Sequence, residues 1–291
     1  MKNDELSGLL HHLGLEPKAE FVGQGVSARV WRVQKRGETF ALRVTRGDTD
    51  EDPRMAADYG VRRSLKGTAA RVAAPVHIGV WNGLEYALDE FVIGAMPTEL
   101  SRDACVQLGE TLAALHRLDH TGFGLLENRS DALVGIASTP EAGVLSRLHH
   151  PFPLEPLSTS AVARVAPAFL PTLRKLELEL LETIIAAPFA VCHSDLHAEQ
   201  IIARDGQLGA LLDFGDAVIG AAVWDIASFA YFHGWDKTTW LLEGYGRSVW
   251  RSAGLFCVIL CLHHLNRSAQ HPARQQKALE RLSDTIERLR E

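Results

Sequence analysis

The chain has 291 residues, of which 46% are hydrophobic and 23% are charged, the balance of a globular protein long enough for one large or two smaller domains with buried cores. Its formal net charge of -6 argues against a nucleic-acid-binding surface as the main feature, because such domains carry a strong basic excess. No apolar run approaches the ~20 residues that span a bilayer, and the first ten residues lack the apolar core of a signal peptide.

Cysteine usage indicates a reducing compartment. The four cysteines lack the paired short spacing of a zinc site. Cys257 and Cys261 lie in one apolar run, which predicts two packed thiols on one face of a helix. We therefore expect a cytoplasmic protein without a membrane segment.

The first third of the chain is predicted to form strands with one helix. Runs rich in β-forming residues predict strands at residues 28–33, 39–44, 76–81 and 84–92. The turn-like Lys35-Arg36-Gly37 separates the first two, and Asn82-Gly83, the strongest short hairpin signal, separates the last two. Between the two pairs we expect a helix with Asp52 as its N-cap, Pro53 at its first position and Gly67 as its stop signal.

The rest of the chain is predicted to be mainly helical. Ser101 is a suitable N-cap for a helix that ends near Arg117, and an apolar period over residues 173–184 marks a second amphipathic helix. Residues 125–160, rich in Pro, Gly and Ser, are expected to be loops or short helices. Helical patterns dominate from Trp224 to the end.

The switch from hairpin signals to helical periodicity predicts the fold class. It occurs near residues 89–95. We expect an α+β fold in which a β-rich N-terminal lobe, residues 1–94, joins a mainly helical C-terminal lobe, residues 95–291.

The most informative segment is a predicted β-hairpin in the second lobe. Asp205-Gly206 separates two apolar runs, which is typical of a two-residue hairpin turn. Folding the chain there puts Gln200 opposite Leu211, with Asp213 two positions further on. The hairpin thus brings Gln200 and Asp213 to one end of a rigid element, and Asp195 lies in the loop that leads into the same end.

This arrangement suits phosphoryl transfer. The reaction needs a carboxylate that accepts the proton of the attacking hydroxyl, and oxygen ligands that hold Mg²⁺ on the nucleotide phosphates. Asp195 fits the base. Asp213 and the side-chain carbonyl of Gln200 fit the metal ligands, because Mg²⁺ prefers hard oxygen donors.

The same residues resemble a known family. The pattern His193-x-Asp195-x-x-x-x-Gln200, followed by Asp213-Phe214-Gly215, resembles the catalytic and metal loops of protein kinases. It is closer to the aminoglycoside phosphotransferase family, whose loop commonly has His-Gly-Asp-Leu-His-x-x-Asn, and Trp224-Asp225-Ile226-Ala227 also looks like that family. The resemblance implies a bilobal protein-kinase-like fold with a nucleotide-binding N-lobe, and O-phosphorylation that depends on ATP or GTP.

The resemblance also bears on neighbouring residues. The family usually has Asn where this chain has Gln200, which keeps the amide carbonyl but is one methylene longer. His193 is expected to orient the loop, and Asp225 to be structural. We expect His197 to be packed or solvent-facing rather than a metal ligand, and Asp216 either to contact a second metal or to cap the loop.

Two features of the first lobe suit nucleotide binding. Gly23, Gly25 and Ser27 precede a predicted strand and suit a turn whose backbone N–H groups face phosphates. The kinase pattern places a cation two strands later, where it holds the α- and β-phosphates. Arg43 takes the usual place of Lys; it retains the charge and offers a two-pronged donor.

An acidic residue on the following helix is expected to pair with Arg43. Asp58 is favoured because it lies one turn into the helix, and Asp52 and Glu51 are the alternatives. The segment Glu90 to Val92 is expected to connect the lobes, where its backbone groups can contact a purine edge.

The acceptor is expected to be a small hydroxyl compound, such as an aminoglycoside, a macrolide or another antibiotic. Residues 120–188 and the C-terminal helices should form its pocket. Glu177, Glu179 and Glu182 suit a cationic acceptor, although a solvated helix face explains them more simply. The oligomeric state stays open.

Two other classes of function compete with the kinase. A nucleotide-binding pseudokinase, acting as a scaffold or regulator, is suggested by the departures at Gln200 and Arg43. A metal-dependent hydrolase would use His193, Asp195 and His197, and would turn over without nucleotide.

Overall fold

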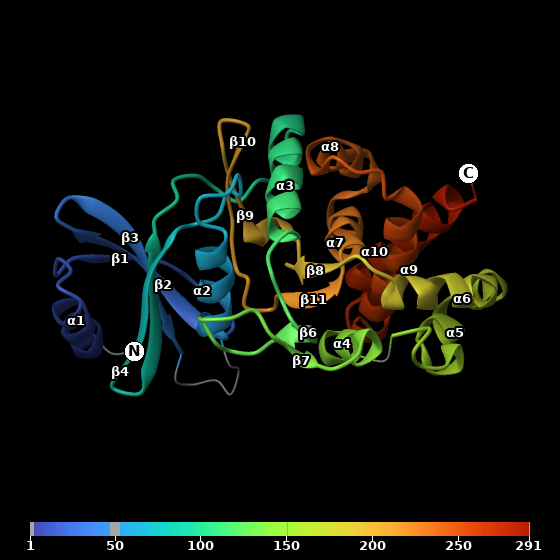
Figure 1. Ribbon diagram of the computed structural model, residues 1–291, viewed down its shortest axis with the longest axis horizontal. Helices are drawn as coiled ribbons and strands as arrows, with labels where there is room; N and C mark the ends of the chain where they lie inside the picture. The colour runs from blue at the N-terminus through green and yellow to red at the C-terminus, as the bar shows by residue number, and fades with distance from the viewer. Residues whose placement is uncertain (1–2, 47–52, 150, 291) are drawn as a thin grey trace.

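The computed structural model describes residues 3–46, 53–149 and 151–290 (Figure 1). It has the predicted α+β architecture, with a β-sheet N-terminal region and a helical C-terminal region. In Figure 1 the N-terminal strands lie at one end of the molecule and the C-terminal helices at the other. Across the described residues, no helix combines the length and the apolarity needed to cross a membrane.

The N-terminal sheet consists of β1 (Ala19–Gln24), β2 (Ala28–Lys35), β3 (Glu38–Thr45), β4 (Pro75–Trp81) and β5 (Leu84–Glu90). These strands are antiparallel and lie in the order β1-β2-β3-β5-β4. The four predicted strands are confirmed, and β1 is an addition. In the turn Asn82-Gly83 both φ angles are positive, at 49° and 81°, which is the geometry of a type I′ hairpin.

Two helices accompany this sheet. Leu9 and Leu10 of α1 (Asn3–His12) share a buried cluster with Val33 and Leu42 of the sheet. Helix α2 (Met55–Ser64) instead contributes to the core of the C-terminal region; Figure 1 shows it between the sheet and that region.

The start of α2 differs from the prediction. Pro53 precedes the helix, and Arg54 takes the N-cap position with a φ of 49° and no side-chain cap. Asp52, the expected cap, lies outside the described residues. The carboxamide Oδ1 of Asn128 accepts hydrogen bonds from the backbone N–H groups of Ala56 and Ala57 at 3.1 and 3.2 Å. A distant loop therefore supplies the cap that the local sequence was expected to supply.

The described residues of the C-terminal region contain six short strands. They are β6 (Phe123–Leu126), β7 (Gly135–Ala137), β8 (Phe189–Cys192), β9 (Ile201–Arg204), β10 (Gln207–Leu211) and β11 (Val218–Ala221). Four of them form a sheet in the order β7-β6-β11-β8, and β9 and β10 form the predicted hairpin. The strands β6, β7, β8 and β11 were not predicted; β11 pairs with β6 and with β8, which are distant from it or short in sequence.

Helices make up most of this region. They are α3 (Arg102–Leu115), α4 (Pro140–Arg147), α5 (Val162–Val165), α6 (Leu170–Ile185), α7 (Val223–His233), α8 (Trp235–Tyr245), α9 (Trp250–Arg267) and α10 (Pro272–Arg288). Single 3-10 turns occur at η1 (Leu157–Thr159), η2 (Pro167–Phe169) and η3 (Ala198–Gln200). As predicted, Ser101 caps α3, accepting a hydrogen bond from the N–H of Ala104.

Close packing of α3 against α8 depends on two glycines. A Cβ on Gly109 would lie 2.0 Å from the carbonyl oxygen of Leu241, and one on Gly244 would lie 1.8 Å from that of Val106. His116 follows α3 and Tyr245 lies on α8, and both support Asp225 in the candidate site. The close packing of the two helices therefore positions these residues.

The predicted thiol pair is also confirmed. Cys257 and Cys261 are buried on α9 and are not joined in a disulfide. The hydroxyl of Thr285 on α10 lies 3.6 Å from the sulfur of Cys257. These thiols belong to the packing between the last two helices.

Candidate active site

The central hairpin turns at Asp205-Gly206, as predicted, but its register differs by one residue. Leu208 pairs with Ala203, and then the register shifts at Gly209, so that Leu211 pairs with Ile201. The expected pairing of Gln200 with Leu211 is therefore wrong. Gln200 instead accepts the N–H of Leu212 through its carbonyl, at 2.8 Å. A β-bulge adds one residue to one strand, and this one brings Asp213 closer to Gln200 than the regular register would.

Gln200 and Asp213 are in direct contact. The amide Nε2 of Gln200 lies 3.2 Å from Oδ2 of Asp213. It also lies 3.1 Å from the ring Nε2 of His197. Asp213 has a φ of 62°, a conformation that L residues adopt rarely and that costs free energy. The strained backbone turns its carboxylate toward the end of the hairpin.

The residue after Asp213 holds this conformation in place. Phe214 is completely buried, and its ring packs edge-on against His193 with centroids 4.9 Å apart. Its backbone N–H donates to Oδ1 of Asp58 at 2.9 Å. The segment is thus fixed from both regions of the protein.

Asp195 lies on a loop whose backbone is held by hydrogen bonds to Asp225. The N–H groups of His193 and Ser194 donate to the two carboxylate oxygens of Asp225, at 2.9 and 2.8 Å. The ring Nε2 of His193 hydrogen-bonds the carbonyl of Leu212 at 2.7 Å. The Asp195 side chain itself remains 32% exposed. The loop is rigid, while its carboxylate is accessible.

Ser194 occupies the place where the resembling family commonly has glycine. Its φ is 71°, which explains the usual glycine. Its hydroxyl donates to the carbonyl of Asp216 at 2.9 Å. This bond and the one to Asp225 hold the non-glycine residue in a left-handed conformation.

Asp225 is itself anchored by α3 and α8. Oδ2 of Asp225 lies 3.0 Å from Nε2 of His116, whose Nδ1 lies 2.9 Å from the hydroxyl of Tyr245. Cys192 lies close enough for these groups to resemble a metal site. However, burial raises the pKa of the Cys192 thiol well above its usual range, so it stays protonated. The cluster is a hydrogen-bonded anchor.

Arg147, at the end of α4, is a site residue that the sequence analysis missed. Its Nη2 lies 3.7 Å from Oδ2 of Asp195 and 3.1 Å from Oδ2 of Asp216. Its Nε donates to the hydroxyl of Ser194 at 3.4 Å. No local pattern identified it, because residues 125–160 showed no clear period.

His197 connects the candidate residues. Its Nε2 lies 3.9 Å from Oδ2 of Asp195 and 3.1 Å from the amide of Gln200, which in turn contacts Asp213. One chain of contacts therefore joins the expected base to the expected metal ligands.

A buried network of charges lies on the N-terminal side. Arg43 pairs with Asp58, as expected, and its Nε donates to Oδ2 of Asp89 at 3.0 Å. Arg62 lies 2.6 Å from Asp58 and 2.9 Å from Asp89, which completes a ring of two cations and two anions. Sequence analysis missed Arg62 and Asp89. The alternatives Glu51 and Asp52 lie outside the described residues.

The network keeps its groups charged. Burial alone raises the pKa of the Asp58 carboxyl, but Arg43 and Arg62 outweigh it and hold that pKa well below its usual range. Burial likewise opposes the charge of Arg43, and Asp58 and Asp89 raise its pKa in net. The Nη1 group of Arg43 makes no hydrogen bond to any described residue, so one prong of the guanidinium is left for a ligand.

The glycine-containing segment covers the end of β1 and the turn into β2. The N–H of Gly25 donates to the carbonyl of Ala28 at 2.9 Å, and the carbonyl of Ser27 accepts from Arg46. Apart from its own chain neighbours, no atom of the described residues lies within 4 Å of a Cβ built on Gly23. The turn has room beside it, and phosphate binding there stays a prediction.

Some backbone N–H groups of the connector between the regions already donate hydrogen bonds within the protein. The N–H of Glu90 donates to Ala74, and that of Phe91 to Thr39. Within the described ranges the N–H of Val92 has no hydrogen-bond partner. Three residues on, Ala95 and Ala203 exchange backbone hydrogen bonds at 3.0 and 2.9 Å. The connector is thus fixed to the hairpin, with the Val92 donor left available.

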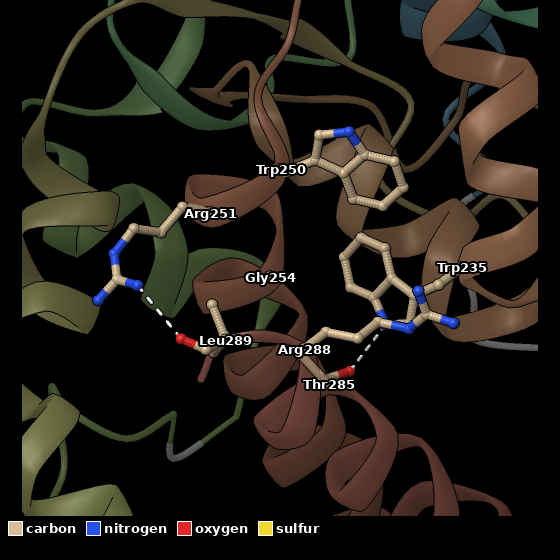
Figure 2. A pocket seen from close by; sticks show the side chains of 7 residues that line it. All are labelled: Trp235, Trp250, Arg251, Gly254, Thr285, Arg288 and Leu289. Carbon is tan, nitrogen blue, oxygen red and sulfur yellow. Dashed lines mark hydrogen bonds between the residues drawn. The ribbon is translucent and has the colours of Figure 1, made fainter. Parts of the chain in front are cut away.

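A cavity of about 230 Å³ lies elsewhere, among α8, α9 and α10 (Figure 2). It is lined by Trp235, Trp250, Arg251, Gly254, Thr285, Arg288 and Leu289. None of the candidate site residues lines it. Glu179 pairs with Arg251 beside this cavity, and so belongs to the far surface rather than to the candidate site.

Comparisons with known proteins agree with this geometry. The model of a family described as the phosphotransferase enzyme family matches residues 18–256. No curated protein sequence matches the chain. The described fold is similar to that of aminoglycoside phosphotransferase APH(4)-Ia, with a TM-score of 0.66 and 14% identity, over 98% of this chain and 99% of that one.

Two further structures were solved with ligands. The GDP complex of aminoglycoside 2'-phosphotransferase-IIIa has a TM-score of 0.61 and 16% identity, over 98% of this chain and 97% of that one. Spectinomycin phosphotransferase APH(9)-Ia, in complex with ADP and spectinomycin, has a TM-score of 0.54 and 14% identity, over 99% and 93%. At these identities the likeness concerns the fold.

Proposed function

Because the chain belongs to the phosphotransferase enzyme family, we propose that it transfers the γ-phosphoryl group of ATP or GTP to a hydroxyl group of a small molecule. The observation that carries the proposal is the chain of contacts from Asp195 through His197 and Gln200 to Asp213. A base and metal ligands must serve the same γ-phosphate, and these contacts support one shared site. Residues 1–94 would hold the nucleotide, and residues 95–291 the acceptor.

The oxygen donors fit a magnesium ion. Two neighbouring ligands of Mg²⁺, each about 2.1 Å from the ion, lie roughly 3 Å apart. The amide Nε2 of Gln200 lies 3.2 Å from Oδ2 of Asp213, so the amide turned to present its oxygen would meet this spacing. These two residues would hold the ion, which when bound supplies positive charge against the nucleotide phosphates.

The other residues would accept the proton, bind the phosphates and position the carboxylate. Asp195 accepts the proton of the acceptor hydroxyl and orients it, since its carboxylate is accessible on a pinned loop. Arg43, held from two sides by Asp58 and Asp89, directs its free Nη1 toward the phosphates. Arg147 fixes the carboxylate of Asp195 from the acceptor side.

The surroundings of Asp195 combine aromatic rings with charged side chains. His197 packs edge-on against Phe232, with ring centroids 5.7 Å apart. Phe232 contacts His264, and Lys277 lies over its ring at 5.0 Å. Arg147 is also present, and it is paired with Asp195 and Asp216. This side therefore combines aromatic rings with charges of both signs, and the acceptor is an aminoglycoside, a macrolide or another antibiotic hydroxyl compound.

The test begins with nucleotide binding. Calorimetry with ATP and GTP, each with and without Mg²⁺, should show magnesium-dependent affinity. Phosphoryl transfer is then measured on a panel of aminoglycosides, macrolides and smaller hydroxyl compounds. Nucleotide binding without transfer to any acceptor would favour the pseudokinase. Turnover without nucleotide would favour the hydrolase.

A further inference from the structure

The hydrogen bonds around Gln200 contain a conflict between donors. The carboxylate of Asp213 only accepts hydrogen bonds, so the amide atom that faces it at 3.2 Å is the N–H₂ group. The same nitrogen lies 3.1 Å from Nε2 of His197. For both contacts to be hydrogen bonds, Nε2 of His197 would have to be an acceptor.

The opposite side of the His197 ring makes that assignment unfavourable. Its Nδ1 accepts the backbone N–H of Glu199 at 3.3 Å. A neutral imidazole carries one proton, and with Nδ1 accepting, that proton is on Nε2. The ring therefore presents an N–H to the amide N–H₂ of Gln200, and two donors face each other.

A cation beside Asp213 would remove the conflict. An amide turned by half a revolution about its terminal bond exchanges its nitrogen and its oxygen. The oxygen would then accept the N–H of His197 and still have a second lone pair for the ion. Both the ion and His197 favour this same orientation.

We propose that His197 is a positioning residue that orients the side-chain oxygen of Gln200 toward the metal ion of the nucleotide. The packing of the ring against Phe232 and the bond from Glu199 fix the ring itself. The inference rests on the proposed magnesium-nucleotide site. It also accounts for glutamine at a position where the resembling family usually has asparagine, since the longer side chain reaches an N–H that can restrain it.

The restraint has a physical reason. A glutamine loses side-chain conformational freedom when it is fixed, which opposes metal binding. A hydrogen bond to a metal ligand from a second residue commonly accounts for 10- to 100-fold in metal affinity. His197 would supply that bond.

The experiment measures Mg²⁺ and Mn²⁺ affinity by calorimetry on protein saturated with a non-hydrolysable ATP analogue. His197→Phe keeps a ring against Phe232 but removes the N–H, and should weaken metal affinity by about 10- to 100-fold. His197→Gln retains an N–H at a similar reach, and should recover most of the loss. Melting temperature and affinity for metal-free nucleotide should match those of the parent in both variants.

A double-substitution cycle tests whether His197 affects metal affinity through Gln200. Gln200→Ala should weaken metal binding, and adding His197→Phe to it should cause no further loss. Parental metal affinity in His197→Phe would overturn the positioning role, and so would an equal loss in both backgrounds. A parent protein that binds no metal with the nucleotide would overturn the proposed site itself, and this inference with it.

Discussion

The backbone N–H of Phe214 donates to Oδ1 of Asp58 at 2.9 Å, and this bond joins the metal-loop segment to helix α2. The same carboxylate pairs with Arg43 and with Arg62. One buried side chain therefore links the expected phosphate-binding cation to the residue that follows Asp213.

Asp58→Asn should lower the free energy of unfolding by about 3–5 kcal/mol, because it leaves buried cations without their counter-charge. Urea denaturation measures this loss. Glu38→Gln, at an exposed position beside a hairpin turn, should stay within about 0.5 kcal/mol of the parent. A loss for Asp58→Asn no larger than that of this control would contradict the role of the network.

Stability should fall as the pH drops below about 6.5, the ordinary pKa of histidine. Burial lowers the pKa of His233 to about 4, and burial with neighbouring cations lowers those of His263 and His264 to about 3. Because the unfolded chain binds these protons first, the stabilisation is complete above pH 6.5 and is lost as the pH falls toward the folded values. Each histidine contributes a slope of up to about 1.4 kcal/mol per pH unit.

Unfolding free energies at pH 7, 6 and 5 test this slope. His264→Gln, which removes one titrating ring, should give a shallower dependence than the parent. A dependence as steep as the parent's would show that His264 does not contribute.

Gly109→Ala should destabilise the protein by about 3 kcal/mol or more, because its Cβ would lie 2.0 Å from the backbone oxygen of Leu241. Separation of α3 from α8 would also disturb His116 and Tyr245, which anchor Asp225. Glu110→Ala, on the exposed face of the same helix, is the matched control. Similar melting temperatures for the two variants would count against the packing described for these helices.

Arg147→Gln should reduce phosphoryl transfer about 10- to 100-fold, as expected for the loss of a charged contact of about 1.5–3 kcal/mol. Nucleotide affinity should not change, because Arg147 contacts Asp195 and Asp216 rather than the residues expected to hold the nucleotide. Arg164→Gln, on the exposed surface of α5, should behave like the parent. Unchanged transfer in Arg147→Gln would remove Arg147 from the site.

The sequence predicted those parts of the fold that are determined by residues adjacent in the chain. The turns at Asn82-Gly83 and Asp205-Gly206, and the cap at Ser101, were predicted because each is determined by the residues at that position. The helix start near Pro53 was wrong, because Asn128 caps α2 from a distant loop.

The candidate site shows the same division. Asp195, Gln200 and Asp213 were identified from their spacing about one hairpin, yet the bulge at Gly209 moved their register by one residue. Arg147 and Asp89 reach the site through tertiary packing, and no local pattern identifies a residue of that kind. Asp58 was found because it lies one turn into the helix that follows the strand of Arg43.

The most direct test of the account replaces Asp195 by asparagine. Asn keeps the size of the side chain and one oxygen but cannot take a proton at neutral pH. Transfer should fall roughly 10²–10⁴-fold, the usual loss of a general base, while melting temperature and nucleotide affinity stay close to those of the parent. Asp216→Asn, which changes the neighbouring carboxylate that pairs with Arg147, is the control and should lose less. Near-parental transfer in a well-folded Asp195→Asn variant would contradict the account.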